Sequence, residues 1–71
     1  MEYSEQIIYI IEKMTTIYSE IIKNQKLYIN KIEEIKHYKS VINVYDCMRN
    51  TDKTLTSFGI KYANNILHEL N

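Results

Sequence analysis

The segment IIYIIEKMTTIYSEIIKNQKLYINKIEEIKHYKSVI, residues 7–42, decides the fold. Two sets of residues spaced seven apart run through it, like the d and a positions of a heptad repeat. The d set reads Ile7, Met14, Ile21, Tyr28, Ile35 and Ile42. The a set reads Ile11, Tyr18, Gln25 and Ile32, and Lys39 ends it. This seam predicts amphipathic helix with packing of the coiled-coil type.

The apolar stripe is wider than the seam itself. The flank that follows each d residue carries Ile8, Ile22 and Ile29, and the opposite flank carries Ile10, Ile17 and Tyr38. A two-stranded coiled coil would leave these side chains in water, so the stripe indicates an all-α bundle with neighbours on both sides. Strand-favouring residues also occur at 7–11 and 41–45, but neither segment alternates strictly and the turn residues of a sheet are missing.

The capping residues at 50–52, Asn-Thr-Asp, predict a helix break. A second helical pattern follows, weakened by Gly59, the only glycine, by about 1 kcal/mol relative to alanine. Its apolar positions are Leu55, Phe58, Tyr62, Ala63, Ile66, Leu67 and Leu70. The polar run at 23–26, Lys-Asn-Gln-Lys, is a weaker break.

Two layouts remain open. We favour a helical hairpin with a long helix over about residues 3–49 and a shorter one over about 53–70, because Gln25 keeps an a position and the seam resumes in phase at Tyr28. The alternative breaks the long helix near Asn24 and gives a three-helix bundle. In the favoured layout, the buried amide of Gln25 would penalise wrong registers and so help to select the partner.

The length and the single cysteine of the chain point to a single domain, residues 1–71, that works through partners. A chain of 71 residues gains little stability from its core alone, and Cys47, the only cysteine, cannot form an internal disulfide. No cysteine–histidine cluster offers a zinc site, so oligomerisation or docking into a larger assembly is the remaining means of stabilisation. The longest apolar run, at 7–11, is far too short to span a membrane, and no signal peptide opens the sequence. We therefore expect an intracellular protein of the cytoplasm or nucleus.

Residues that could carry chemistry are isolated. Glu34 and His37 form a Glu-x-x-His motif, but they fall on the outer face of the predicted helix. Cys47 has no histidine beside it in sequence to act as a base, and His37 and His68 stand alone. We expect no catalytic residue, no metal site and no cofactor, and hence no enzyme.

The charge pattern argues against nucleic acid. Nine basic and nine acidic residues give a net charge of zero. The lysine-rich middle of the chain is interrupted by Glu33 and Glu34, which makes a solvated helix face the simpler interpretation. The predicted interface for protein partners is the seam with its neighbours: Ile7, Ile11, Met14, Tyr18, Ile21, Gln25, Tyr28, Ile32, Ile35, Tyr38, Ile42 and Tyr45.

Residues 37–48, HYKSVINVYDCM, resemble the Glu-Phe-x-Ser-Val-x-x-Leu-Trp pattern of small Dad-type subunits of the fungal DASH kinetochore complex. Ser40 and Val41 match this pattern, whereas Tyr38, Val44 and Tyr45 replace its phenylalanine, leucine and tryptophan. The Val-Gly pair that precedes the pattern in that family is absent. The resemblance implies a non-enzymatic subunit of a complex that rings microtubules.

Two hypotheses for function follow from these features. The first is a non-enzymatic helical interaction subunit of a hetero-oligomeric assembly. The alternative is a small helical regulator or inhibitor, of viral or phage type, that docks in a groove of a partner protein. Nucleic-acid binding is a third, less favoured hypothesis. A stable set of small helical partners on co-purification would favour the first hypothesis, and one large partner would favour the second.

Overall fold

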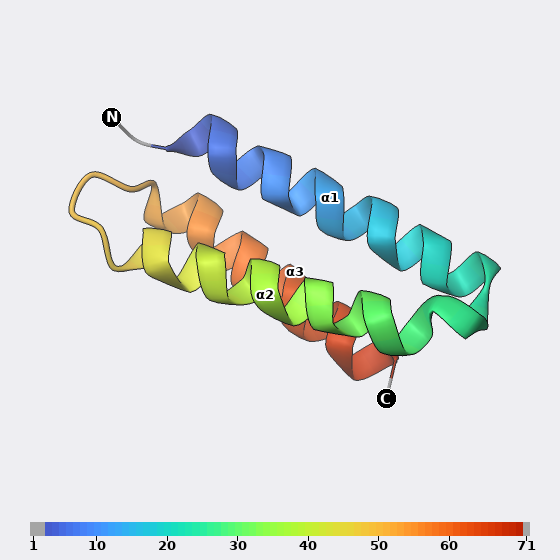
Figure 1. Ribbon diagram of the computed structural model, residues 1–71. Helices are drawn as coiled ribbons and strands as arrows, with labels where there is room; N and C mark the ends of the chain where they lie inside the picture. Colours follow the sequence, from blue (N-terminus) through green and yellow to red (C-terminus); the bar gives the residue numbers. More distant parts are fainter. Residues whose placement is uncertain (1–2, 71) are drawn as a thin grey trace.

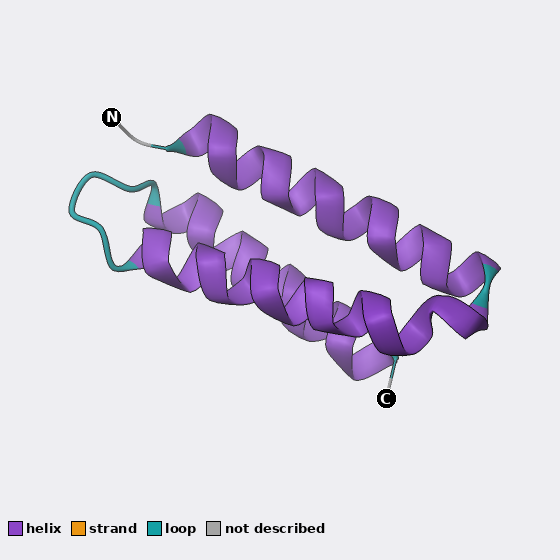
Figure 2. Cartoon of the chain, in the orientation of Figure 1, coloured by secondary structure: helices purple, strands orange, loops and turns teal. Residues whose placement is uncertain are grey.

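Three α-helices pack against one another over residues 3–70, the part of the chain that the computed structural model describes (Figures 1 and 2). Helix α1 spans Ser4–Lys23, and a short 3-10 turn, η1, spans Gln25–Leu27. Helix α2 spans Tyr28–Asp46, and α3 spans Lys53–Glu69. Helices α1 and α3 run in the same direction and α2 runs against them (Figure 1). The all-α prediction is confirmed, with the three-helix arrangement that was the alternative layout.

The favoured long helix is wrong because the chain turns at Asn24. This residue has an extended backbone, with φ −147° and ψ 98°, and its side-chain Oδ1 accepts a hydrogen bond of 3.1 Å from the backbone nitrogen of Lys26. Asparagine competes with helical hydrogen bonding in this way. Gln25 lies exposed in η1 rather than in a buried seam, so the role expected of its amide in that seam is corrected as well.

Folding back at Asn24 lets two halves of the seam bury each other. The d residues of both helices enter one core, where five of them are 2% exposed or less: Ile7, Met14 and Ile21 from α1, and Ile35 and Ile42 from α2. The seam stays in phase across the turn because each helix points its own d residues at the same core. Phase alone therefore does not indicate a continuous helix.

The two flanks of the seam have different fates. Ile10 and Ile17 are buried with the d residues of α1, as the wide stripe predicts. On the other flank, Ile8, Ile22 and Ile29 are 46%, 61% and 75% exposed. The expectation that neighbouring helices cover both flanks is therefore wrong for this side of the bundle.

The α2–α3 connection is fixed by polar contacts at its two ends. Helix α2 ends at Asp46, three residues before the predicted end, and the Asp52 carboxylate caps α3 by accepting from the backbone nitrogens of Thr54 (3.0 Å) and Leu55 (3.1 Å). The ammonium of Lys53 donates to the backbone carbonyl of Asp46, at the negative end of the α2 dipole. The Thr56 hydroxyl donates to the Asp46 carboxylate at 2.6 Å.

Three of the four buried residues of α3 are small. Its buried positions are Thr56, Gly59, Ala63 and Ile66. A Cβ placed on Gly59 would lie 2.9 Å from Cδ1 of Ile42 and 3.4 Å from Cδ1 of Ile11, so the missing side chain allows α3 to approach both other helices. Phe58, which the apolar pattern places with the core, is 56% exposed.

Candidate protein-binding face

Helices α1 and α3 are joined along one side by specific contacts. The Thr15 hydroxyl donates to the carbonyl of Ile11 at 3.0 Å and lies 2.6 Å from the Tyr62 hydroxyl. Since the hydrogen of Thr15 is directed to Ile11, Tyr62 must be the donor to Thr15. These contacts set Thr15 level with Tyr62, and Ile11 level with Gly59.

The solvent side of this helix pair carries several apolar side chains. On α1, Ile8, Thr15 and Ile22 are spaced seven apart and therefore share one side of the helix. On α3, Phe58 stacks on Tyr62 with ring centroids 5.9 Å apart and planes inclined by 7°. We call this surface the α1–α3 face, and its residues are Ile8, Ile11, Thr15, Ile22, Leu55, Phe58 and Tyr62.

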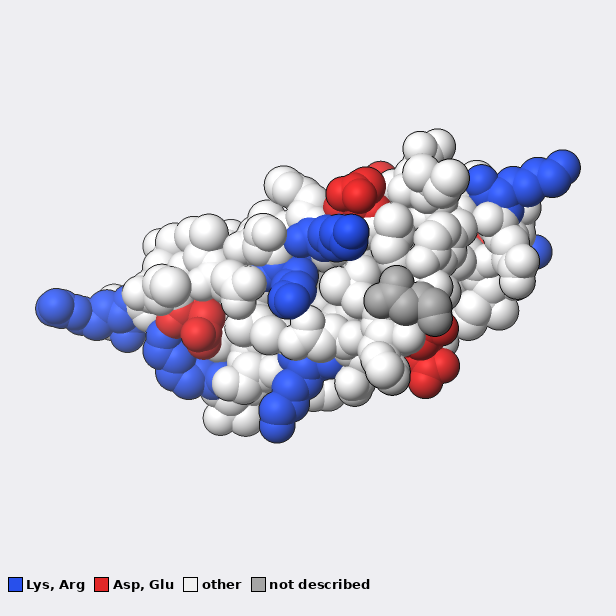
Figure 3. Space-filling model, turned by 90° about the horizontal axis from the view of Figure 1, so that it is seen from below, with Lys and Arg blue, Asp and Glu red and all other residues white. Residues whose placement is uncertain are grey.

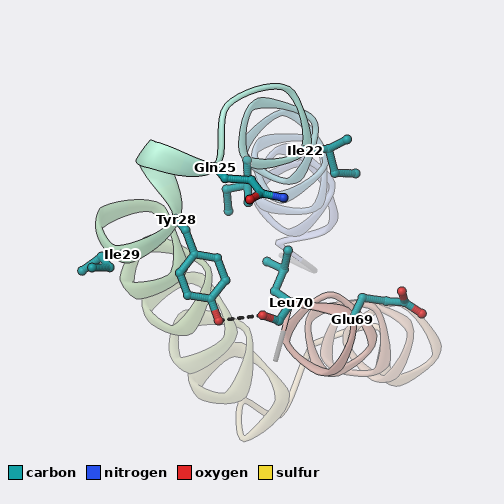
Figure 4. A pocket seen from close by; sticks show the side chains of 7 residues that line it. Ile22, Gln25, Tyr28, Ile29, Glu69 and Leu70 are labelled. Atoms are coloured by element: carbon teal, nitrogen blue, oxygen red, sulfur yellow. Dashed lines mark hydrogen bonds between the residues drawn. The ribbon is translucent and has the colours of Figure 1, made fainter.

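The face ends in an open groove of about 560 Å³ beside the Asn24 turn (Figure 4). Its walls are Ile21, Ile22, Gln25, Tyr28, Ile29, Glu69 and Leu70. The Tyr28 hydroxyl donates to the Leu70 carbonyl at 2.7 Å, which ties the start of α2 to the end of α3. Ile22 of α1 and Ile29 of α2 stand on the rim of this groove and point outward (Figure 4).

The predicted interface residues divide between core and surface. Five of the twelve are fully buried in the chain's own core and Ile32 is 9% exposed, so a partner could reach these six only if the bundle opened. Five more are half-buried: Ile11, Tyr18, Tyr28, Tyr38 and Tyr45. Gln25 is exposed.

The wide apolar stripe predicts that neighbouring helices cover Ile8, Ile22 and Ile29, whereas all three are exposed. Single exposed apolar residues are ordinary, whereas a contiguous set marks a surface that another protein covers. The exposed apolar residues of this bundle thus indicate a protein-binding surface. In the sequence, these isoleucines could be recognised only by their spacing in multiples of seven residues beside the seam. The position of α3 then shows that this side of α1 faces solvent.

Charged residues on the bundle neutralise one another locally. The Lys31 ammonium lies 3.5 Å from the Glu20 carboxylate of α1 and 3.5 Å from the Glu34 carboxylate. Attraction by Glu20 and then by Glu34 raises the pKa of Lys31. Lys36 lies 3.7 Å from Glu33. On the side seen from below in Figure 3, basic and acidic side chains are interspersed and form no extended basic patch.

The residues considered for chemistry lie apart. Glu34 and His37 are exposed on the outer side of α2, as their heptad positions predict. Cys47 is exposed at the end of α2, and His68 is exposed near the end of α3. Within the described part of the chain, no three His, Cys, Asp or Glu side chains gather where they could hold a metal ion.

Comparisons with protein-family models, curated proteins and solved structures find no match to this chain. Each helix within residues 3–70 is too short or too polar to cross a membrane.

Proposed function

We propose that this protein is a non-enzymatic helical interaction subunit that docks on protein partners through its α1–α3 face. The observation that carries the proposal is a set of three exposed apolar side chains, Ile8, Ile22 and Phe58, each 46–61% exposed, on two helices that are already packed together. Water contact with these side chains costs free energy, at roughly 25 cal/mol per Å² of apolar surface, that a partner's cover would recover.

Order within the face supports this use. The Tyr62–Thr15 hydrogen bond and the Phe58–Tyr62 stack hold aromatic side chains in place before any partner arrives. A surface whose side chains are already fixed loses less conformational entropy on binding than a flexible one does. Aromatic residues are also enriched at the centres of protein interfaces.

This interaction fits both hypotheses for function that the sequence suggests. A hetero-oligomeric assembly is the leading setting, and the resemblance of residues 37–48 to Dad-type subunits makes a DASH-like kinetochore complex one specific form of it. In this fold Val44, which replaces the leucine of that pattern, is 60% exposed on α2. The alternative is a small regulator that docks on one larger protein.

A pull-down with matched variants tests the proposal. We expect Phe58→Ser, which removes the largest exposed ring of the α1–α3 face, to abolish recovery of the specific partner. Val44→Ser is the control, because it removes an apolar side chain of similar exposure from α2. Equal recovery with both variants, each folded by circular dichroism, would show that the α1–α3 face is not the binding surface.

A further inference from the structure

We infer that the partner on the α1–α3 face is a second copy of this chain. The two copies are related by a two-fold axis parallel to the helices, so that α1 of each lies over α3 of the other. This inference rests on the proposed function and narrows its partner to a self-association. It follows from the signs of the charges beside the face and from the size of the face.

Opposite charges stand level with one another on the two helices. Because Thr15 is level with Tyr62, Glu12 on α1 and Lys61 on α3 lie within about one turn of the same level. Both side chains are exposed. Ile22 and Glu69 line the same groove, which brings Lys23 level with Glu69. The α1 border thus carries an acid and then a base, and the α3 border carries a base and then an acid.

A two-fold axis along the bundle uses this arrangement directly. It keeps levels unchanged while exchanging α1 for α3, so Glu12 of each copy meets Lys61 of the other, and Lys23 meets Glu69. Symmetry makes each pair occur twice. Four opposite-charge pairs would therefore border the apolar contact, where they favour one orientation over others.

The other face-to-face symmetry is disfavoured by the same residues. A two-fold axis across the bundle would lay α3 against α3 in opposite directions. Lys61 is the middle residue of α3, which spans Lys53–Glu69, so an axis placed across the middle of α3 would set Lys61 against its own copy. Juxtaposed like charges oppose association.

The bundle is long enough for an extended contact. It measures 39 × 19 × 16 Å, so one whole side, of which the α1–α3 face is part, covers at most roughly 740 Å² in projection. A standard specific interface buries about 800 Å² on each partner, so the pair would have to use most of that side. In the proposed pairing, Ile8 lies opposite Leu55 of the other copy, and Thr15 lies opposite Tyr62 of the other copy. Ile8 then meets the equally large Leu55, and the small Thr15 meets the large Tyr62.

Charge reversal of the Glu12–Lys61 pair tests the inference. Native mass spectrometry and sedimentation at micromolar concentration should find the wild-type chain as a dimer. Glu12→Lys alone, and Lys61→Glu alone, should each weaken the dimer about ten-fold, because two like-charge contacts replace two attractive ones. A mixture of the two variants should form the heterodimer, since every contact then has opposite signs again.

The control is Glu33→Lys, the same charge reversal on the outer side of α2, which should leave the dimer unchanged. A folded wild-type chain that stays monomeric overturns the inference, whereas loss of a different partner with Phe58→Ser would still support the proposed function. A dimer that ignores both reversals, or a mixture that pairs at random, also overturns it. A dimer that Phe58→Ser leaves intact overturns the use of this face.

Discussion

Two buried threonines near the α2–α3 turn differ in whether the hydroxyl has a partner. The Thr56 hydroxyl donates to Asp46 at 2.6 Å, whereas the buried Thr51 hydroxyl has no hydrogen-bond partner among the described residues. Thr51→Val should therefore leave the free energy of unfolding unchanged or raise it by up to about 1 kcal/mol. Thr56→Val should lower it by about 1–3 kcal/mol. Urea unfolding followed by circular dichroism measures both, and equal losses would contradict the assignment.

Gln25 and Ile21 are four residues apart and should respond very differently to substitution. Gln25 is exposed in η1, so Gln25→Ile should change the free energy of unfolding by less than about 0.5 kcal/mol. Ile21 is 2% exposed, so Ile21→Ala should cost about 2–5 kcal/mol. Thermal melts of both variants provide the comparison. Strong stabilisation by Gln25→Ile would contradict the exposed position of Gln25 and support a continuous helix with Gln25 in a buried seam.

At the scale of elements, the start of α3 depends on one carboxylate. Asp52 accepts from two backbone nitrogens that have no partner within the helix. Asp52→Ala should lower the free energy of unfolding by about 0.5–2 kcal/mol, whereas Asp52→Ser should retain most of the stability, because a hydroxyl also caps. Asn50→Ala, at an exposed position of the same loop, is the control. Chemical denaturation should give the lowest free energy of unfolding for Asp52→Ala, a higher one for Asp52→Ser and the highest for Asn50→Ala.

The seven-residue pattern could predict helices and their inward sides, and the residues at 50–52 could predict a cap. It could not decide between a turn and a continuous helix at Asn24. A helix that folds back and one that continues keep the same seven-residue step. The two cases differ in whether the seam packs against its own chain or against another one. The free energy of that packing does not depend on residues 23–26 alone.

The candidate face was hidden by the composition of α3. This helix packs through Gly59 and Ala63, which carry little apolar signal, while the large ring of Phe58 points to solvent. The apolar pattern of α3 therefore misplaces Phe58, although Ala63 and Ile66 of the same pattern are buried. Without the position of α3, the exposed flank of α1 could not be distinguished from the buried one.

For the whole molecule, self-association links stability to concentration. A dimer that forms only from folded chains stabilises them by mass action, so the Tm of the wild-type protein should rise as its concentration increases. The Tm of Glu12→Lys should change much less over the same range. Circular dichroism melts at several concentrations, in cells of different path length, provide the measurement. A wild-type Tm that does not depend on concentration would contradict the dimer.

Three helices in alternating directions leave Tyr3 and Leu70 at opposite ends of a bundle 39 Å long (Figure 1). This limits how two copies can be fused in tandem. In the parallel pair, the connecting peptide must return along the whole bundle, which takes at least about 12 fully extended residues. In an antiparallel pair, the end of one copy would lie beside the start of the next, and a few residues would suffice. The length of the shortest connecting peptide that still yields a closed single-chain dimer therefore shows whether its two halves are parallel or antiparallel.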